Sequence, residues 1–133
     1  MTASTLCAAV LALGHAGPAP VARATCEHVA ASAEAHGVPV ALALALAWHE
    51  SRLSPAAVSR RGAVGPLQVT RWLHRRAIDV TGAGVEELAR LLGRHRPERA
   101  ICHYQHGVTC PPSGLIRARR VLRLASRLQP SAL

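Results

Sequence analysis

Glu50 is the residue whose type and position best suit acid–base chemistry. No other acidic residue lies between Glu34 and Asp79, and Glu50 follows the apolar run ALALALAW. Steps of four residues lead from Leu42 through Leu46 to Glu50, so the carboxyl extends a buried stripe near the end of a predicted helix. Burial and the negative end of the helix dipole both raise the pKa of such a carboxyl. A carboxyl that stays protonated near neutral pH can act as a general acid.

Two neighbours of Glu50 support an alternative interpretation. His49 and Arg52 flank it in the sequence, and either cation would lower the pKa of the carboxyl if it packed nearby. A glutamate at a frayed helix end, solvated or paired with Arg52, would have no catalytic role. Residues elsewhere in the chain must decide between the two interpretations.

Two further segments carry residues with chemical uses. The segment GAVGPLQVT contains Gly62 and Gly65, which allow the backbone to approach a ligand closely, and Gln68, which offers a side-chain amide. The segment CHYQHG places Tyr104 and Gln105 at the end of a predicted helix that a glycine closes.

In this order, the segments resemble the soluble lytic transglycosylases, whose domain is related to goose-type lysozyme. The shared features are Glu-Ser at the end of an apolar helix, a later Gly-Ala-x-Gly-x-x-Gln segment, and a tyrosine-containing helix end followed by glycine. The resemblance covers about residues 27–128. It implies an all-α, lysozyme-like small helical domain with a substrate groove, acting on peptidoglycan glycan strands without a metal or cofactor.

The resemblance also implies a role for each matched residue. Glu50 would be the single catalytic acid and base. Hydroxyl, amide and closely approaching backbone groups of six further residues would hold the substrate or orient Glu50. These six residues are Ser51, Gly62, Gly65, Gln68, Tyr104 and Gln105.

The chain departs from the family pattern at several positions. The position after the tyrosine usually holds asparagine, whereas Gln105 is one methylene longer. Pro66 and Leu67 stand where Leu-Met is common. The family often has a tyrosine in its last helix that reaches the catalytic glutamate, and residues 113–128 contain none. How Glu50 is oriented is therefore the open question.

The single carboxylate decides which reaction is expected. Ordinary glycosidases use two carboxylates, and the motif region offers only Glu50. Glu50 would protonate the oxygen of the MurNAc-β-1,4-GlcNAc bond and then activate the 6-hydroxyl of the sugar, giving 1,6-anhydro-MurNAc. The alternatives are a hydrolytic lysozyme (muramidase), which admits water, and a basic non-catalytic helical module that binds glycan or another polyanion.

The first 24 residues have the features of a secretory signal peptide. Residues 6–13 form a short apolar run, and Ala22-Arg23-Ala24 fits a signal-peptidase site. Cleavage would leave residues 25–133 as a secreted or periplasmic catalytic domain. A mistaken start site and a short hydrophobic helix are the alternatives.

The four cysteines fit an oxidising compartment. Cleavage would remove Cys7. Cys102 and Cys110 lie close together around a glycine-containing turn and are the favoured disulfide pair, although Cys26 could bond to either. The two histidines between them do not give the spacing of a standard zinc finger, so no metal is expected.

Composition favours an all-α chain of one domain. Hydrophobic residues make up 50% of the 133 residues and aromatic residues 2%, so alanine and leucine must build the core. Helices are expected at residues 25–36 (capped by Thr25), 38–51, 68–78, 85–92, 97–105 and 115–128.

The formal net charge is +9, and every cationic residue other than histidine is arginine. A strongly basic protein is attracted to polyanions. The last predicted helix could draw the protein to anionic wall polymers, and export would separate it from nucleic acid. A monomer is expected. The arginines concerned are Arg117, Arg120, Arg123 and Arg127.

Overall fold

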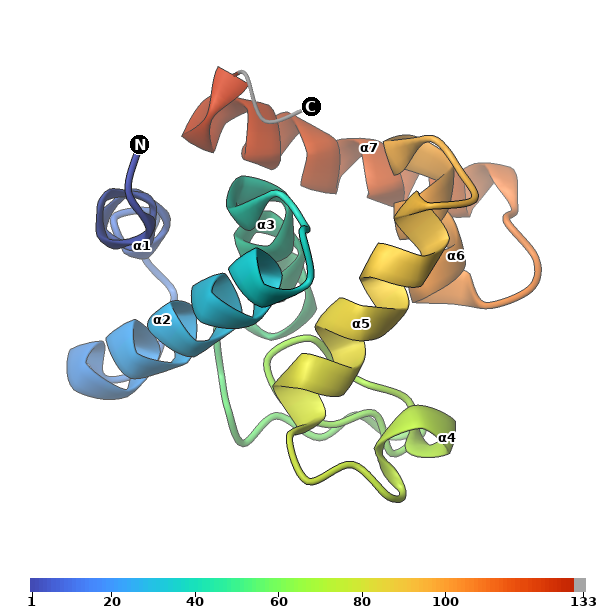
Figure 1. Cartoon of the computed structure of the whole chain (residues 1–133), viewed down its shortest axis with the longest axis horizontal. Coiled ribbons are helices and arrows are strands. Elements are labelled where there is room, and N and C mark those ends of the chain that lie inside the picture. Colours follow the sequence, from blue (N-terminus) through green and yellow to red (C-terminus); the bar gives the residue numbers. More distant parts are fainter. Residues whose placement is uncertain (131–133) are drawn as a thin grey trace.

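The computed structural model describes residues 1–130, and within them the chain forms seven α-helices (Figure 1). The β-type contacts in this range are isolated antiparallel bridges around Val64. The predicted all-α class is therefore confirmed. None of the helices in this range has the length and apolar character needed to cross a bilayer. The helices are α1 (Ala3–Leu11), α2 (Ala19–Ala35), α3 (Val40–Ser51), α4 (Arg71–His74), α5 (Val80–Leu92), α6 (Pro97–His106) and α7 (Pro112–Leu128).

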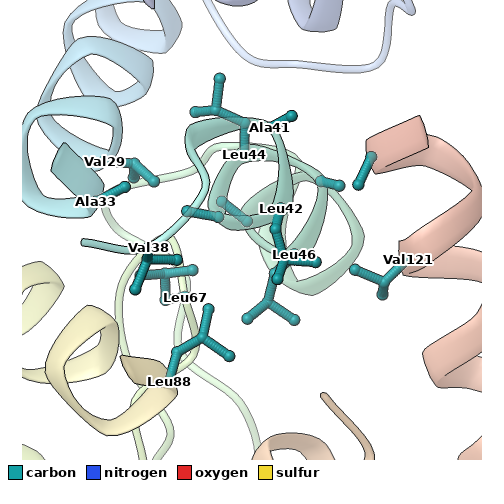
Figure 2. Packing of buried hydrophobic residues seen from close by; sticks show 14 of the residues in the cluster. Val29, Ala33, Val38, Ala41, Leu42, Leu44, Leu46, Leu67, Leu88 and Val121 are labelled. Atoms are coloured by element: carbon teal, nitrogen blue, oxygen red, sulfur yellow. The ribbon is translucent and has the colours of Figure 1, made fainter. Parts of the chain in front are cut away.

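Helix α3 lies at the centre of the core, and its residues 41–47 are all fully buried. The alternation of alanine and leucine makes this helix apolar on every side, as a helix surrounded by protein must be. Helices α1, α2 and α7 pack against it. Figure 2 shows Val29 of α2 on one side of α3 and Val121 of α7 on the other. The helix that carries Glu50 in its last turn is thus held from several directions.

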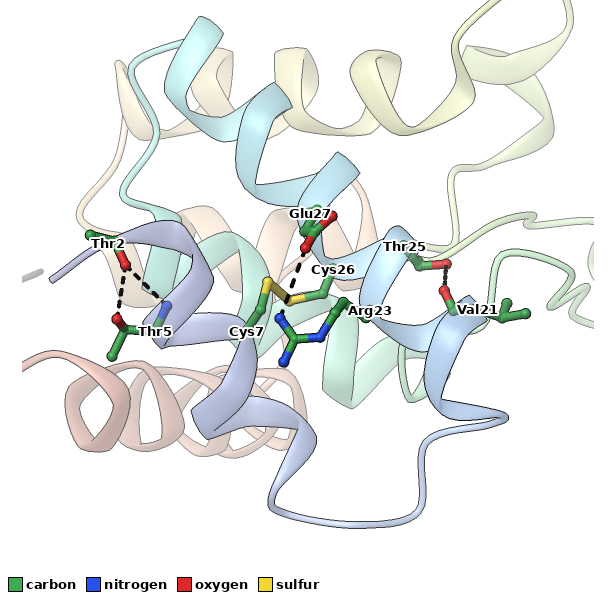
Figure 3. Close-up of a disulfide and its surroundings, with 8 residues drawn as sticks. All are labelled: Thr2, Thr5, Cys7, Val21, Arg23, Thr25, Cys26 and Glu27. Atoms are coloured by element: carbon green, nitrogen blue, oxygen red, sulfur yellow. Dashed lines mark hydrogen bonds and ion pairs between the residues drawn. A yellow bond between two sulfur atoms is a disulfide. The ribbon is translucent and has the colours of Figure 1, made fainter.

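Helix α2 begins at Ala19 rather than at residue 25, so the expectation that Thr25 caps this helix is wrong. Pro20 occupies the first turn, where a missing N–H costs nothing. Thr25 lies inside the helix, and its hydroxyl donates to the carbonyl of Val21 at 2.8 Å (Figure 3).

Helix α5 is longer than predicted because two glycines do not interrupt it. Asp79 caps the helix, its carboxylate accepting from the N–H of Gly82 at 3.0 Å. Gly84 is buried, and a Cβ added there would lie 2.8 Å from a methyl of Val69 and 2.9 Å from the Tyr104 hydroxyl. This glycine is needed for close packing inside a helix, not for a break. The predicted helix at 68–78 is reduced to the four residues of α4.

Helix α1 falls in the segment predicted to be removed, and the structure includes it as part of the core. Leu6 and Val10 are buried, and Cys7 forms a disulfide with Cys26 of α2 (Figure 3). Cleavage after Ala24 stays a prediction, and it would separate the two halves of this disulfide.

Candidate active site

Glu50 lies in the last turn of α3, with its carboxyl largely withdrawn from water. Burial raises the pKa of this carboxyl above its ordinary value. Two groups oppose the shift because they favour the charged form. The Gln105 side-chain amide of α6 donates from Nε2 to Oε1 of Glu50 at 3.1 Å, and Arg117 of α7 contributes positive charge. Burial outweighs both, so Glu50 holds its proton more firmly than a solvated glutamate does.

Arg52 does not take the role that the alternative interpretation gave it. Its guanidinium lies over the ring of Trp48, with Cζ 3.5 Å from the ring centroid, a cation–π arrangement. Among residues 1–130 no ion pair joins it to Glu50. Its left-handed backbone, with φ of 56°, ends α3. His49 contacts Trp48 edge-on, and burial followed by the charge of Arg52 lowers its pKa.

Ser51 connects the end of α3 to the glycine-containing loop. Its hydroxyl donates to the carbonyl of Pro66 at 2.7 Å and accepts from the N–H of Ser54 at 3.1 Å. This contact fixes the loop beside Glu50. The role of Ser51 is thus to position the loop, because its hydroxyl is engaged with backbone groups.

Gln68 holds the same loop in shape. Its Nε2 donates to the carbonyls of Ala57 at 3.2 Å and Gly65 at 3.0 Å, so both hydrogens of the side-chain amide are used within the loop. Its φ of 48° lies in the left-handed region, which non-glycine residues rarely adopt. Gly62 and Gly65 also have positive φ, of 82° and 80°, which suits glycine. The loop is therefore a tightly constrained turn.

Tyr104 stabilises this loop through a hydrogen bond to its backbone. Its hydroxyl donates to the carbonyl of Leu67 at 2.9 Å, and burial raises its pKa, so it stays protonated. Gly84 leaves the space that the hydroxyl occupies. Tyr104 therefore contacts the loop backbone, whereas its neighbour Gln105 reaches the carboxyl of Glu50.

The structure thus brings the expected site residues together in two ways. Gln105 contacts Glu50 directly, and the others determine the position of the loop beside it. Sequence reasoning missed two interactions near the site. The positive charge of Arg117 acts on the carboxyl of Glu50, and the His74 ring donates from Nε2 to the carbonyl of Gly62 at 2.9 Å. Both interactions join residues from different elements, for which the local sequence gives no signal. The expected role of Arg117 toward wall polymers stays a prediction.

A disulfide closes the turn that follows α6. Cys102 and Cys110 are bonded, with 5.7 Å between their Cα atoms, and the bond holds the end of α6 against the start of α7. The helix end that carries Gln105 is thereby anchored beside Arg117. In the described part of the chain, no three histidine, cysteine or acidic side chains are grouped to hold a metal ion.

Comparison with known proteins gives one match. A family model described as "Transglycosylase SLT domain" matches residues 27–105. No curated protein and no solved structure matches the chain. The matched residues include Glu50, the loop beside it and Gln105, and they end before α7.

Proposed function

Because the chain belongs to the transglycosylase SLT domain family, whose substrate is peptidoglycan, we propose that it is a lytic transglycosylase with Glu50 as its single acid and base. The observation that carries this proposal is the environment of the Glu50 carboxyl. Burial at the end of α3 raises its pKa, as a general acid near neutral pH requires. Gln105 contacts the same carboxyl and can stabilise its charged form once the proton has left.

The proposed reaction follows from one carboxyl acting twice. Protonated Glu50 gives its proton to the oxygen of the MurNAc-β-1,4-GlcNAc bond, and the bond from that oxygen to the anomeric carbon of MurNAc breaks. The carboxylate then accepts the proton of the 6-hydroxyl, whose oxygen bonds to the anomeric carbon. The product is 1,6-anhydro-MurNAc, and Glu50 is protonated again. Neither water nor a cofactor takes part in these steps.

The carboxylate of Asp79 already has a structural role. It caps α5, and it lies 3.1 Å from the His28 ring. The hydrogen bond from the Gly82 N–H, followed by that with His28, lowers its pKa. Asp79 is thus engaged at the start of α5, and Glu50, whose pKa is raised, is the carboxyl suited to be the acid of the site.

The decisive experiment compares the wild-type protein with Glu50→Gln on purified sacculi. The variant keeps the shape of the side chain and loses the transferable proton, so release of soluble fragments should fall by at least about a hundredfold. Normal release by a folded Glu50→Gln protein would exclude this assignment. Mass spectrometry of the fragments identifies the reaction, because anhydro ends indicate the lyase and reducing ends indicate a hydrolytic muramidase.

We also propose that the protein acts outside the cytoplasm, where peptidoglycan lies. Two disulfides in the described residues support this location, because such bonds persist in oxidising compartments. The substrate partner is the glycan strand, and no nucleic-acid partner is proposed. A monomer suffices for the site described, since Glu50, Gln105 and the loop come from one chain.

A further inference from the structure

A hollow of about 320 Å³ lies beside α7. Its walls come from α7, from the last turns of α3 and from the segment that follows α1. The side chains that carry the argument are Leu13, Trp48, His49, Arg120, Arg123 and Arg127. Neither Glu50 nor Gln105 lines it, so the hollow is separate from the proposed active site.

Three arginines give the hollow its charge. Arg120, Arg123 and Arg127 follow one another at spacings of three and four residues, which places them on one face of α7. All three are exposed, and no ion pair within residues 1–130 involves any of them. Arg119, the neighbour of Arg120, instead pairs with Glu98 at 3.1 Å. Among residues 1–130 no carboxylate side chain lines the hollow, so none of these residues neutralises its positive charge from within.

The other wall is apolar and aromatic. Trp48 and Leu13 line it. The indole N–H of Trp48 is buried and has no hydrogen-bond partner among the described residues. His49 is partly buried here, and its pKa is lowered by burial and by Arg52, so the positive charge at neutral pH comes from the arginines. The hollow therefore combines a strongly cationic side with an apolar side formed by Leu13 and Trp48.

The number and type of these cations select the ligand. A guanidinium binds phosphate and carboxylate oxygens through paired N–H groups. A single phosphate or carboxylate would leave much of the positive charge of the three arginines unmatched, whereas successive phosphates of a polymer would match it. We propose that this hollow binds phosphate groups of an anionic wall polymer and so holds the enzyme at its substrate. This proposal rests on the proposed function only for the location of the protein at the cell wall.

The test uses tryptophan fluorescence as a local reporter. The chain has two tryptophans, and Trp72 is 81% exposed on α4. A Trp72→Phe protein retains Trp48 alone, within the hollow. It is titrated with inorganic phosphate, with poly(glycerol phosphate), and with phosphatidylglycerol vesicles. We expect a saturable change with phosphate and with the polymer, the polymer binding more tightly, and weakened binding as salt rises.

Two sets of substitutions that remove the same amount of charge distinguish binding in the hollow from an effect of the protein's net charge. In this background, Arg120, Arg123 and Arg127 are changed to Gln together. The control changes Arg60, Arg75 and Arg76, which are also exposed and without an ion pair in residues 1–130. The α4 region lies at the other end of the molecule from α7 (Figure 1). The first set should weaken polymer binding at least about tenfold, and the control less than about threefold.

Each outcome bears on the proposal. Equal weakening by both sets, or no saturable change in the Trp48 signal, would overturn it. Binding to vesicles but not to the polymer would overturn the wall polymer as the occupant. If the triple variant fails to fold, Arg123→Gln alone should still weaken polymer binding about threefold. Cleavage of short soluble glycan strands should be unchanged in the triple variant, so this proposal and the catalytic assignment fail independently.

Discussion

Tyr104→Phe removes one hydroxyl from the interior and tests whether this residue serves the loop or the substrate. The hydroxyl donates to the carbonyl of Leu67 at 2.9 Å. It lies against α5 so closely that a Cβ on Gly84 would come within 2.9 Å of it. Because the position is closed, we expect no water to replace the hydroxyl, and the carbonyl of Leu67 loses its partner.

The size of the effect follows from that unpaired carbonyl. Leaving a buried acceptor without a donor costs about 1–3 kcal/mol in the free energy of unfolding. The entropy of unfolding is about 2.1 cal/mol/K per residue near 60 °C, or roughly 0.28 kcal/mol/K for the 133 residues of this chain. The Tm should therefore fall by roughly 4–11 °C.

Calorimetry of both proteins measures the stability, and kcat and KM on soluble glycan strands are measured well below both transitions. If Tyr104 supports the loop, Tm falls while kcat stays within a few-fold of wild type. A large loss of activity with an unchanged Tm would refute this reasoning and place the hydroxyl on the substrate. Arg119→Ala is the control, because loss of its exposed ion pair with Glu98 should cost no more than about 1 kcal/mol.

Three further predictions concern the same site. Gln105→Ala removes the donor to the Glu50 carboxylate, so the pKa of Glu50 should rise and the alkaline limb of the kcat profile should move to higher pH. Gln105→Glu also lacks the amide donor, so it should not return the alkaline limb to its wild-type position. Glu50→Gln should raise the free energy of unfolding at neutral pH. The pKa of Glu50 in the folded protein lies above its ordinary value of 4.5, so ionisation of Glu50 destabilises the fold as the pH rises above 4.5. Each unit by which the pKa is raised costs about 1.4 kcal/mol at high pH. Chemical denaturation should therefore show that the stability gained by Glu50→Gln disappears at lower pH. Gly84→Ala should lower stability by about 1–3 kcal/mol in the same assay, because its methyl would overlap Val69 and Tyr104.

The central helix could be predicted because its local signals agree. The alternation of alanine and leucine imitates a strand, but Pro39 before the helix and the content of alanine favour a helix. The structure has α3 from Val40 to Ser51. Since this helix is buried on every side, the position of Glu50 near the helix end already indicated that the pKa of its carboxyl is raised.

The partners of Glu50 could not be predicted, because they depend on how distant helices pack. Gln105 was expected to contact the substrate, and nothing in the local sequence indicates that its amide reaches a carboxyl 55 positions away. Gly84 shows the same limit. Its residue type indicated an interruption, whereas close packing against Tyr104 explains a glycine inside a helix.

Residues 1–24 show where a local pattern and the packing of the chain lead to opposite expectations. The apolar run and the Ala-x-Ala site indicate removal, yet Cys7 is bonded to Cys26, and Leu6 and Val10 are buried. A disulfide spanning 19 positions contributes about 3 kcal/mol. A chain that starts at residue 25 should therefore be less stable by about this amount, before the lost apolar contacts are counted, and should titrate one thiol, at Cys26. The mass of the exported protein decides between the two: a chain that keeps Cys7 would exclude cleavage after Ala24, and a chain that starts at Thr25 and still cleaves sacculi would show that the active site forms without α1.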